Sequence, residues 1–154
     1  RKLPWKLRIL TFESLLKAGS GHVGPCLSMA EILTCLFFRT MNVDRSDSSR
    51  DKFVLSKGHG VPILYSVFSE LGWIKKDELN SLRQIDSRLQ GHPDKIALEC
   101  LDSGSGALGQ GISISIGYAL QSAAAIMMVA PIAVLFMLFQ RRFISGLTSG
   151  GLKE

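Results

Sequence analysis

Apolar residues at helical spacing open the chain and predict a helix over residues 5–18. The positions assigned to a single face of this helix are Leu7, Leu10, Leu15 and Leu16. Gly19 follows directly, and glycine readily takes the positive φ that ends a helix. The first element is therefore expected to bury one leucine-rich side and to stop at residue 19.

Further helices are predicted between residues 28 and 80. The stretch "SMAE", residues 28–31, fits a capping box, in which the serine hydroxyl and the glutamate carboxylate bind free amides at a helix start. An apolar run then continues to Met41. A third helix is expected from about Gly60 to Gly72, and a short fourth from about Asp77.

Strand-like stretches are few. Residues 53–55, "FVL", form a short β-like run, and "KIALECLD", residues 95–102, is expected to be extended. The stretch "GISISIGYAL", residues 111–120, fits a helix or a strand, and its pattern alone leaves both open.

The last third of the chain carries a long uncharged segment. No charged residue occurs from residue 103 to 140, and residues 123–139 read "AAAIMMVAPIAVLFMLF". About 20 such residues in a helix cross a bilayer, so this run is of borderline length, and Pro131 is expected to kink it. Arg141 and Arg142 follow and would lie on the cytoplasmic side, with the preceding residues outside. The alternatives are a buried helix, or two core strands broken at the proline.

Composition narrows the class of protein. With 154 residues, 46% of them hydrophobic, the chain can bury the core of one ordinary domain. The net charge of +5 comes from scattered basic residues without interleaved aromatics, so no nucleic-acid partner is expected. Cys26, Cys35 and Cys100 are odd in number and form no CxxC pair, so neither a disulfide framework nor a zinc site is indicated. A reducing compartment follows.

All three histidines of the chain, His22, His59 and His92, directly follow a glycine. A helix that starts after "KGHG" would point its free amides at an anion above His59, and flanking glycines let a phosphate approach the backbone. Histidine adds a donor whose proton moves near neutral pH. The alternative for each is a loop histidine that is bonded to a carbonyl.

A second glycine-rich stretch is "SGSGALGQG", residues 103–111, which contains GxGxxG at Gly104, Gly106 and Gly109. A dinucleotide site of this type needs a preceding strand, a following helix and an acidic residue about 20 positions later. No carboxylate side chain occurs after Asp102 until Glu154, so this alternative lacks its ribose ligand.

Four stretches in order and spacing resemble the thiamine-diphosphate-binding, amino-terminal part of transketolases. They are "KAGSGHVGPCLSMAEIL", "SRDKFVLSKGHGVPILYSVFSELG", "LRQIDSRLQGHPD" and "SGALGQGISISIGYAL". The resemblance covers residues 8 to about 121. It implies an α/β fold, a truncated thiamine-diphosphate-binding domain over residues 1–121 that is mostly helical and is followed by an apolar C-terminal helix.

The resemblance also implies a function and a site. Transketolases transfer a two-carbon ketol unit between sugar phosphates with thiamine diphosphate. The family pattern implies that His22 and His92 are catalytic residues facing the sugar, and that His59 lies against the diphosphate. The backbone of Gly106, Ala107 and Leu108 would also bind the cofactor. A cytoplasmic enzyme is expected.

Departures from the family pattern suggest an incomplete enzyme. Val23 and Pro25 stand where the family has proline and glycine after the first histidine. The Gly-Asp-Gly segment that holds Mg²⁺ or Ca²⁺ is absent, so we expect no metal ligands in this chain. The pyrimidine-binding half is also missing, and it would come from a carboxyl-terminal transketolase subunit or a homodimer partner.

Residues 122–154, "SAAAIMMVAPIAVLFMLFQRRFISGLTSGGLKE", resemble instead the carboxyl terminus of sugar ABC transporter permeases. This resemblance implies a junction near residues 119–122 and a permease-like helix with a basic end. The expected location is therefore the cytoplasm, with possible membrane association through residues 123–139. The alternative function is a catalytically silent, membrane-associated chimera.

Overall fold

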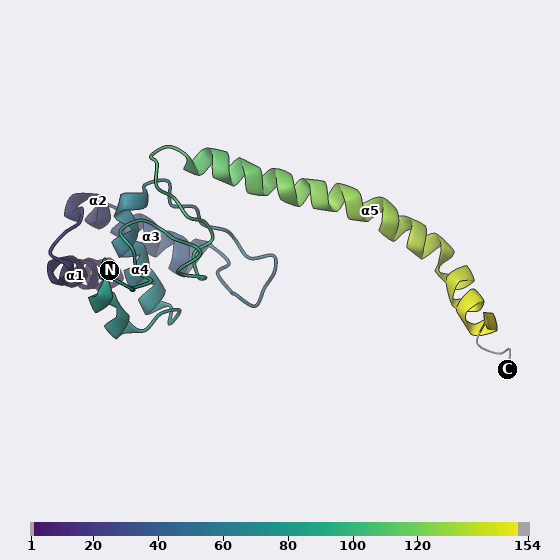
Figure 1. The fold of residues 1–154 in the computed structure, drawn as a ribbon, viewed down its shortest axis with the longest axis horizontal. Helices are drawn as coiled ribbons and strands as arrows, with labels where there is room; N and C mark the ends of the chain where they lie inside the picture. The colour runs from purple at the N-terminus through teal and green to yellow at the C-terminus, as the bar shows by residue number, and fades with distance from the viewer. Residues whose placement is uncertain (1, 151–154) are drawn as a thin grey trace. The chain divides into compact units, whose positions relative to one another are not determined.

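A computed structural model describes residues 2–150 and divides the chain into two compact units, Arg1–Ile114 and Ser115–Glu154, which are treated separately below. The elements of this structure (Figure 1) are α1 (Lys2–Ala18), α2 (Val23–Leu27), α3 (Ala30–Cys35), the π-helix η1 (Leu36–Thr40), the 3₁₀ helices η2 (Gly58–Gly60) and η3 (Lys76–Ser81), α4 (Val61–Glu70) and α5 (Gly111–Gly150).

Helix α1 confirms the first predicted helix, and Gly19 ends it with a φ of +63°. Its buried side is formed by Leu7, Leu10, Thr11, Ser14 and Leu15. The assignment of Leu16 to this side was wrong, since that side chain is 64% exposed. Nine residues at 100° each place Leu16 opposite Leu7 on the helix.

Helix α4 is the centre of the first unit. Every residue from Val61 to Phe68 is buried, as expected of a helix that is covered on all sides. Helix α1 packs along α4, and buried hydroxyls join the two helices, with Thr11 Oγ1 2.8 Å from Ser66 Oγ. The predicted helix from Gly60 to Gly72 is confirmed within two residues, and Gly72 ends it with a φ of +75°.

The predicted capping box over residues 28–31 was wrong. Met29 is the N-cap residue of α3, and it makes no side-chain cap bond. Ser28 Oγ donates instead to the carbonyl of Pro25 at 3.1 Å. Glu31 accepts two hydrogen bonds of 2.7 Å from Arg8 on α1. Both side chains that the local pattern assigned to the helix start therefore bind other partners, Pro25 and Arg8.

The fold is mostly helical, and the expected strands are absent from residues 2–150. Residues 53–55 form no strand, and residues 95–102 consist of turns and irregular segments. Side chains satisfy the backbone instead, because Asp102 accepts from the Phe53 amide at 2.9 Å and Ser105 Oγ donates to the Leu55 carbonyl at 2.7 Å. The α/β part of the prediction is therefore not found in this fragment.

Helix α5 forms nearly all of the second unit and confirms the predicted apolar C-terminal helix. It begins at Gly111 and continues through Pro131. Its side chains from Ser115 to Arg141 are exposed, and so is Ile144. The alternative of two strands broken at Pro131 is therefore wrong. By length and composition, Gly111–Arg141 could cross a membrane; Val23–Thr40 passes the same test but is partly buried in the first unit.

Candidate functional site

The three histidines that follow a glycine lie around one short helix, η2, in the first unit. His22 is the N-cap residue of α2, His59 lies in η2 just before α4, and His92 lies in the loop after η3. The rings of His22 and His59 meet edge to face, with centroids 5.1 Å apart. A Cβ placed on Gly58 would lie 3.2 Å from Cδ2 of His92, so this third ring is beside the same short helix.

Gly58 is the point where the histidine loops and the glycine-rich loop meet. It is buried, and a Cβ at this position would lie 2.9 Å from Ser105 Oγ and 3.0 Å from the Ser105 carbonyl oxygen. Contacts this short leave no space for a side chain. The glycine before His59 therefore permits close packing of three loops that are far apart in the sequence.

Ser105 fastens these loops to one another. Its amide donates to the carbonyl of Pro93 at 3.1 Å, and its hydroxyl donates to the carbonyl of Leu55 at 2.7 Å. The first bond fixes the residue after His92, and the second fixes the segment that leads to His59. Ser105 was not predicted as a site residue, since a serine in a glycine-rich loop carries no signal of such distant partners.

Tyr65 holds the His92 loop against the core. It is 1% exposed, and its hydroxyl donates to the carbonyl of Gln90 at 2.9 Å. Burial raises the pKa of Tyr65 well above its ordinary value, so the group stays neutral and acts as a donor. Tyr65 was also missed, because a tyrosine on an apolar helix gives no sign that its hydroxyl binds a distant loop.

The electrostatics around η2 favour a neutral imidazole beside a fixed positive charge. Partial burial, followed by the nearby His22, Lys57 and His92, holds the pKa of His59 below its ordinary value. Lys57 Nζ lies 3.2 Å from Ser28 Oγ. Neutral His59 can donate one hydrogen bond while Lys57 supplies charge, which together suit an anionic ligand.

The predicted cofactor residues Gly106, Ala107 and Leu108 lie on an exposed turn. The loop is fixed before them by Ser105 and after them at Gly111, whose amide donates to Ser56 Oγ at 3.2 Å. No atom lies within 4 Å of the position that a Cβ on Gly106 would take. The structure thus ties both ends of this turn to the segment around His59 and leaves its middle accessible.

The dinucleotide alternative for this glycine-rich loop fails on a second requirement. Helix α5 does follow the loop, and Gly109 takes a φ of +86°. The residues before Gly104 form turns and bends, however, and no strand occurs anywhere in residues 2–150. The motif demands a strand directly before its first glycine, and Gly104 does not follow one.

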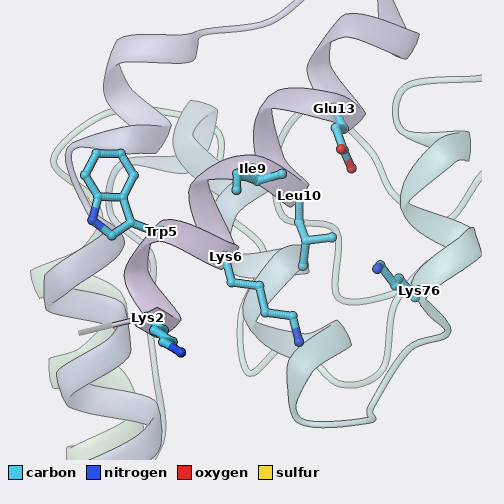
Figure 2. Close-up of a pocket in the computed structure, with 7 residues that line it drawn as sticks. All are labelled: Lys2, Trp5, Lys6, Ile9, Leu10, Glu13 and Lys76. Atoms are coloured by element: carbon cyan, nitrogen blue, oxygen red, sulfur yellow. The ribbon is translucent and has the colours of Figure 1, made fainter.

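Among the open hollows on the first unit, two bear on the position of the site. One, of about 550 Å³, is lined by residues 90–96 and Gly104 and so includes His92. The other, of about 480 Å³, lies along α1 and is lined by Lys2, Trp5, Lys6, Ile9, Leu10, Glu13 and, from η3, Lys76 (Figure 2). It contains none of the predicted site residues, and the candidate site is therefore the region around the histidines.

Within residues 2–150, no group of three or more histidine, cysteine or acidic side chains could hold a metal ion. Cys26, Cys35 and Cys100 are all free, and burial raises the pKa of the Cys26 thiol to about 11. The described residues thus offer an anion-binding arrangement of imidazoles, a lysine and exposed glycine backbone, without a metal centre of their own.

The first unit is a helical domain in which histidines and a glycine-rich turn lie around one short helix. Such an arrangement is typical of a cofactor-binding domain. The chain belongs to the transketolase family, since the family described as "Transketolase, thiamine diphosphate binding domain" matches residues 2–131. This match continues beyond residue 121, where the resemblance quoted above ends. These comparisons do not show the permease-like character of the tail.

Relatives and solved structures agree with this family. Transketolases of Homo sapiens and Mus musculus are each 46% identical over 118 residues, covering 74% of this chain and 19% of theirs. The transketolase structure from Leishmania mexicana has a TM-score of 0.71 at 32% identity, covering 75% of this chain and 18% of that chain. A Pichia stipitis transketolase in complex with sedoheptulose 7-phosphate gives a TM-score of 0.65 at 32% identity over 72% of this chain and 17% of that chain. The chain thus spans about a fifth of the length of the relatives it matches.

Proposed function

We propose that this chain supplies the diphosphate-binding side of a transketolase-type site, which transfers a two-carbon ketol unit between sugar phosphates. The observation that supports this proposal is the gathering of His22, His92 and the glycine-rich loop around η2, with His22 against His59 and the other two against Gly58. The family supports the cofactor, thiamine diphosphate. A relative solved with a sugar phosphate supports the substrate class.

The described residues fit the diphosphate end of this cofactor. His59 and Lys57 provide a hydrogen-bond donor and a positive charge beside one another. The open backbone at Gly106 lets an anion approach without meeting a side chain. When bound, thiamine diphosphate supplies the electron sink that cleavage next to a carbonyl requires.

His22 and His92 are assigned to the sugar in this proposal. Both side chains are exposed, so a substrate can reach them, and both lie beside η2. Each imidazole would hold or move a proton at a hydroxyl or carbonyl oxygen of the sugar. Ser105 and Tyr65 position His92 through the Pro93 and Gln90 carbonyls and do not themselves act on the substrate.

A metal ion does not fit the described residues of this chain. Mg²⁺ and Ca²⁺ need several correctly placed oxygen ligands, and no such group is present in residues 2–150. No step is assigned to a metal here. A carboxyl-terminal transketolase subunit, or a second transketolase chain, would have to supply the rest of the site.

The test is a titration of the full chain with thiamine diphosphate and Mg²⁺, followed by calorimetry, with and without a carboxyl-terminal transketolase subunit. Saturable binding that falls at least about tenfold in the variant His59→Gln supports the proposal. The variant Ile85→Gln is the control, because Ile85 is 93% exposed and lies outside the site. The absence of binding in both conditions would refute the proposal.

The alternative is a catalytically silent chain that attaches to a membrane and carries a permease-like tail. It is favoured by the exposed apolar side chains of α5 and by the missing metal ligands. The same titration separates the two functions, because the silent chain would bind no thiamine diphosphate under either condition. Location alone does not decide between them, since an enzyme can also be attached to a membrane.

A further inference from the structure

Helix α5 is apolar around its whole circumference in its central part. Four consecutive residues, Met127 to Ala130, point about 100° apart and therefore sample every side of the helix. Met127, Met128 and Val129 are 70%, 66% and 61% exposed, and Ala130 is exposed as well. A surface helix of a globular protein has a single apolar stripe, so this pattern demands an apolar surrounding on all sides.

The length of this apolar part, measured between the residues at its two ends, matches the thickness of a bilayer. Tyr118 and Arg141 are separated by 23 residues in one continuous helix, which corresponds to about 35 Å. The hydrocarbon core of a bilayer is about 30 Å thick, and tyrosine and arginine are typical of its two interfaces. The structure therefore extends the apolar run of residues 123–139 into a helix that is long enough to span.

The polar groups of this segment are compatible with a hydrocarbon surrounding. Between Tyr118 and Arg141 there is no charged residue, and the polar side chains lie near the two ends, at Gln121, Ser122 and Gln140. Ser122 Oγ donates to the Tyr118 carbonyl at 3.0 Å, so this hydroxyl is satisfied within the helix. Pro131 lacks an amide proton, and membrane-spanning helices tolerate such breaks.

We propose that residues 119–140 of α5 cross a lipid bilayer as a single helix, with Tyr118 and Arg141 at its two interfaces. A protein partner would cover one side of the helix, whereas lipid covers all of them. This inference depends on α5 alone and is independent of ketol transfer. Binding of thiamine diphosphate and membrane insertion can therefore succeed or fail separately.

The experiment uses the full chain, synthesised without cells in the presence of vesicles of phosphatidylcholine and phosphatidylglycerol. Membrane insertion is measured by flotation of the chain with the vesicles and by its resistance to extraction at alkaline pH. The unmodified chain should float and resist extraction. A chain that stays in the soluble fraction, or that pellets without floating, overturns the inference.

Single lysines at consecutive positions distinguish lipid from a protein surface. The variants Met127→Lys, Met128→Lys, Val129→Lys and Ala130→Lys should each lower the insertion equilibrium by about 70-fold or more, because each places a charge near mid-bilayer. The variant Ile112→Lys removes an equally exposed apolar side chain outside the span and should float unchanged. An effect confined to one or two of the four positions, or absent from all four, overturns the inference.

Discussion

The variant Gly58→Ala tests whether close packing at one glycine holds the histidine loops together. The added methyl group would lie 2.9 Å from Ser105 Oγ, 3.0 Å from the Ser105 carbonyl oxygen and 3.2 Å from Cδ2 of His92. The hydroxyl cannot rotate away without breaking its bond to the Leu55 carbonyl, and the carbonyl oxygen moves only with its backbone. The glycine-rich loop must therefore shift.

The expected cost follows from two effects. Overpacking of a buried site costs about 1–3 kcal/mol, and the loss of the Ser105 hydrogen bond adds about 1 kcal/mol. Relaxation of the loop recovers part of this, so we expect the free energy of unfolding of the first unit to fall by about 2 kcal/mol. That change is a factor of about 30 in the folding equilibrium.

Denaturant unfolding of the full chain in a mild detergent measures this change, with α5 covered equally in every variant. The matched control is Gly24→Ala, because no atom lies within 4 Å of the Cβ position at Gly24 and a helix prefers alanine. The three histidine resonances should also shift in Gly58→Ala and not in the control. Equal stability of the two variants, with unchanged histidine resonances, would refute the packing argument.

Three further predictions concern charged and titratable groups of the first unit. Lys57→Met should raise the pKa of His59, as measured by NMR titration, because burial and nearby positive charge lower that pKa in the unmodified chain. The contribution of neutral His59 to the free energy of unfolding is therefore present above about pH 6.5, and it is lost as the pH falls through the pKa of His59 in the folded chain. Asp102→Asn should lower the free energy of unfolding by about 2 kcal/mol, because it weakens a largely buried ion pair with Arg50, and an unchanged denaturation midpoint would contradict this. Burial by itself raises the pKa of Asp102, but hydrogen bonds from Arg50 and from the Phe53 amide lower this pKa on balance. The contribution of the carboxylate to the free energy of unfolding is therefore present above the ordinary pKa of about 3.8, and it is lost as the pH falls through the pKa of Asp102 in the folded chain. Cys26 should react with a thiol reagent at pH 8 at least about 100-fold more slowly than an unshifted thiol, as its pKa of about 11 implies, and equal rates would contradict its burial.

Local patterns predicted the helices well where the relevant interactions are close in sequence. The helix that ends at Gly19 and the helix that ends at Gly72 depend on apolar spacing and on glycine at positive φ, which neighbouring residues define. The capping box over residues 28–31 failed because its two side chains bind Pro25 and Arg8 instead. A pattern of four residues carries no information about such competing partners.

The candidate site shows the same division. The sequence alone marked His22, His59 and His92 by their preceding glycines, and the quoted stretches identified the family. Their meeting around η2 was decided by the tertiary structure, because Ser105 and Tyr65 bind loops that are up to 50 residues away.

What the sequence by itself determined is the pair of helices that end at Gly19 and Gly72, the family and the uncharged apolar segment after residue 103, since all three are written in residue types and spacing. Only the tertiary structure decided that residues 53–55 lack a partner strand, that Gly58 must be free of a side chain and that α5 is exposed around its circumference. The physical reason is that burial and hydrogen-bond satisfaction depend on which distant segments meet, and local patterns do not record those meetings.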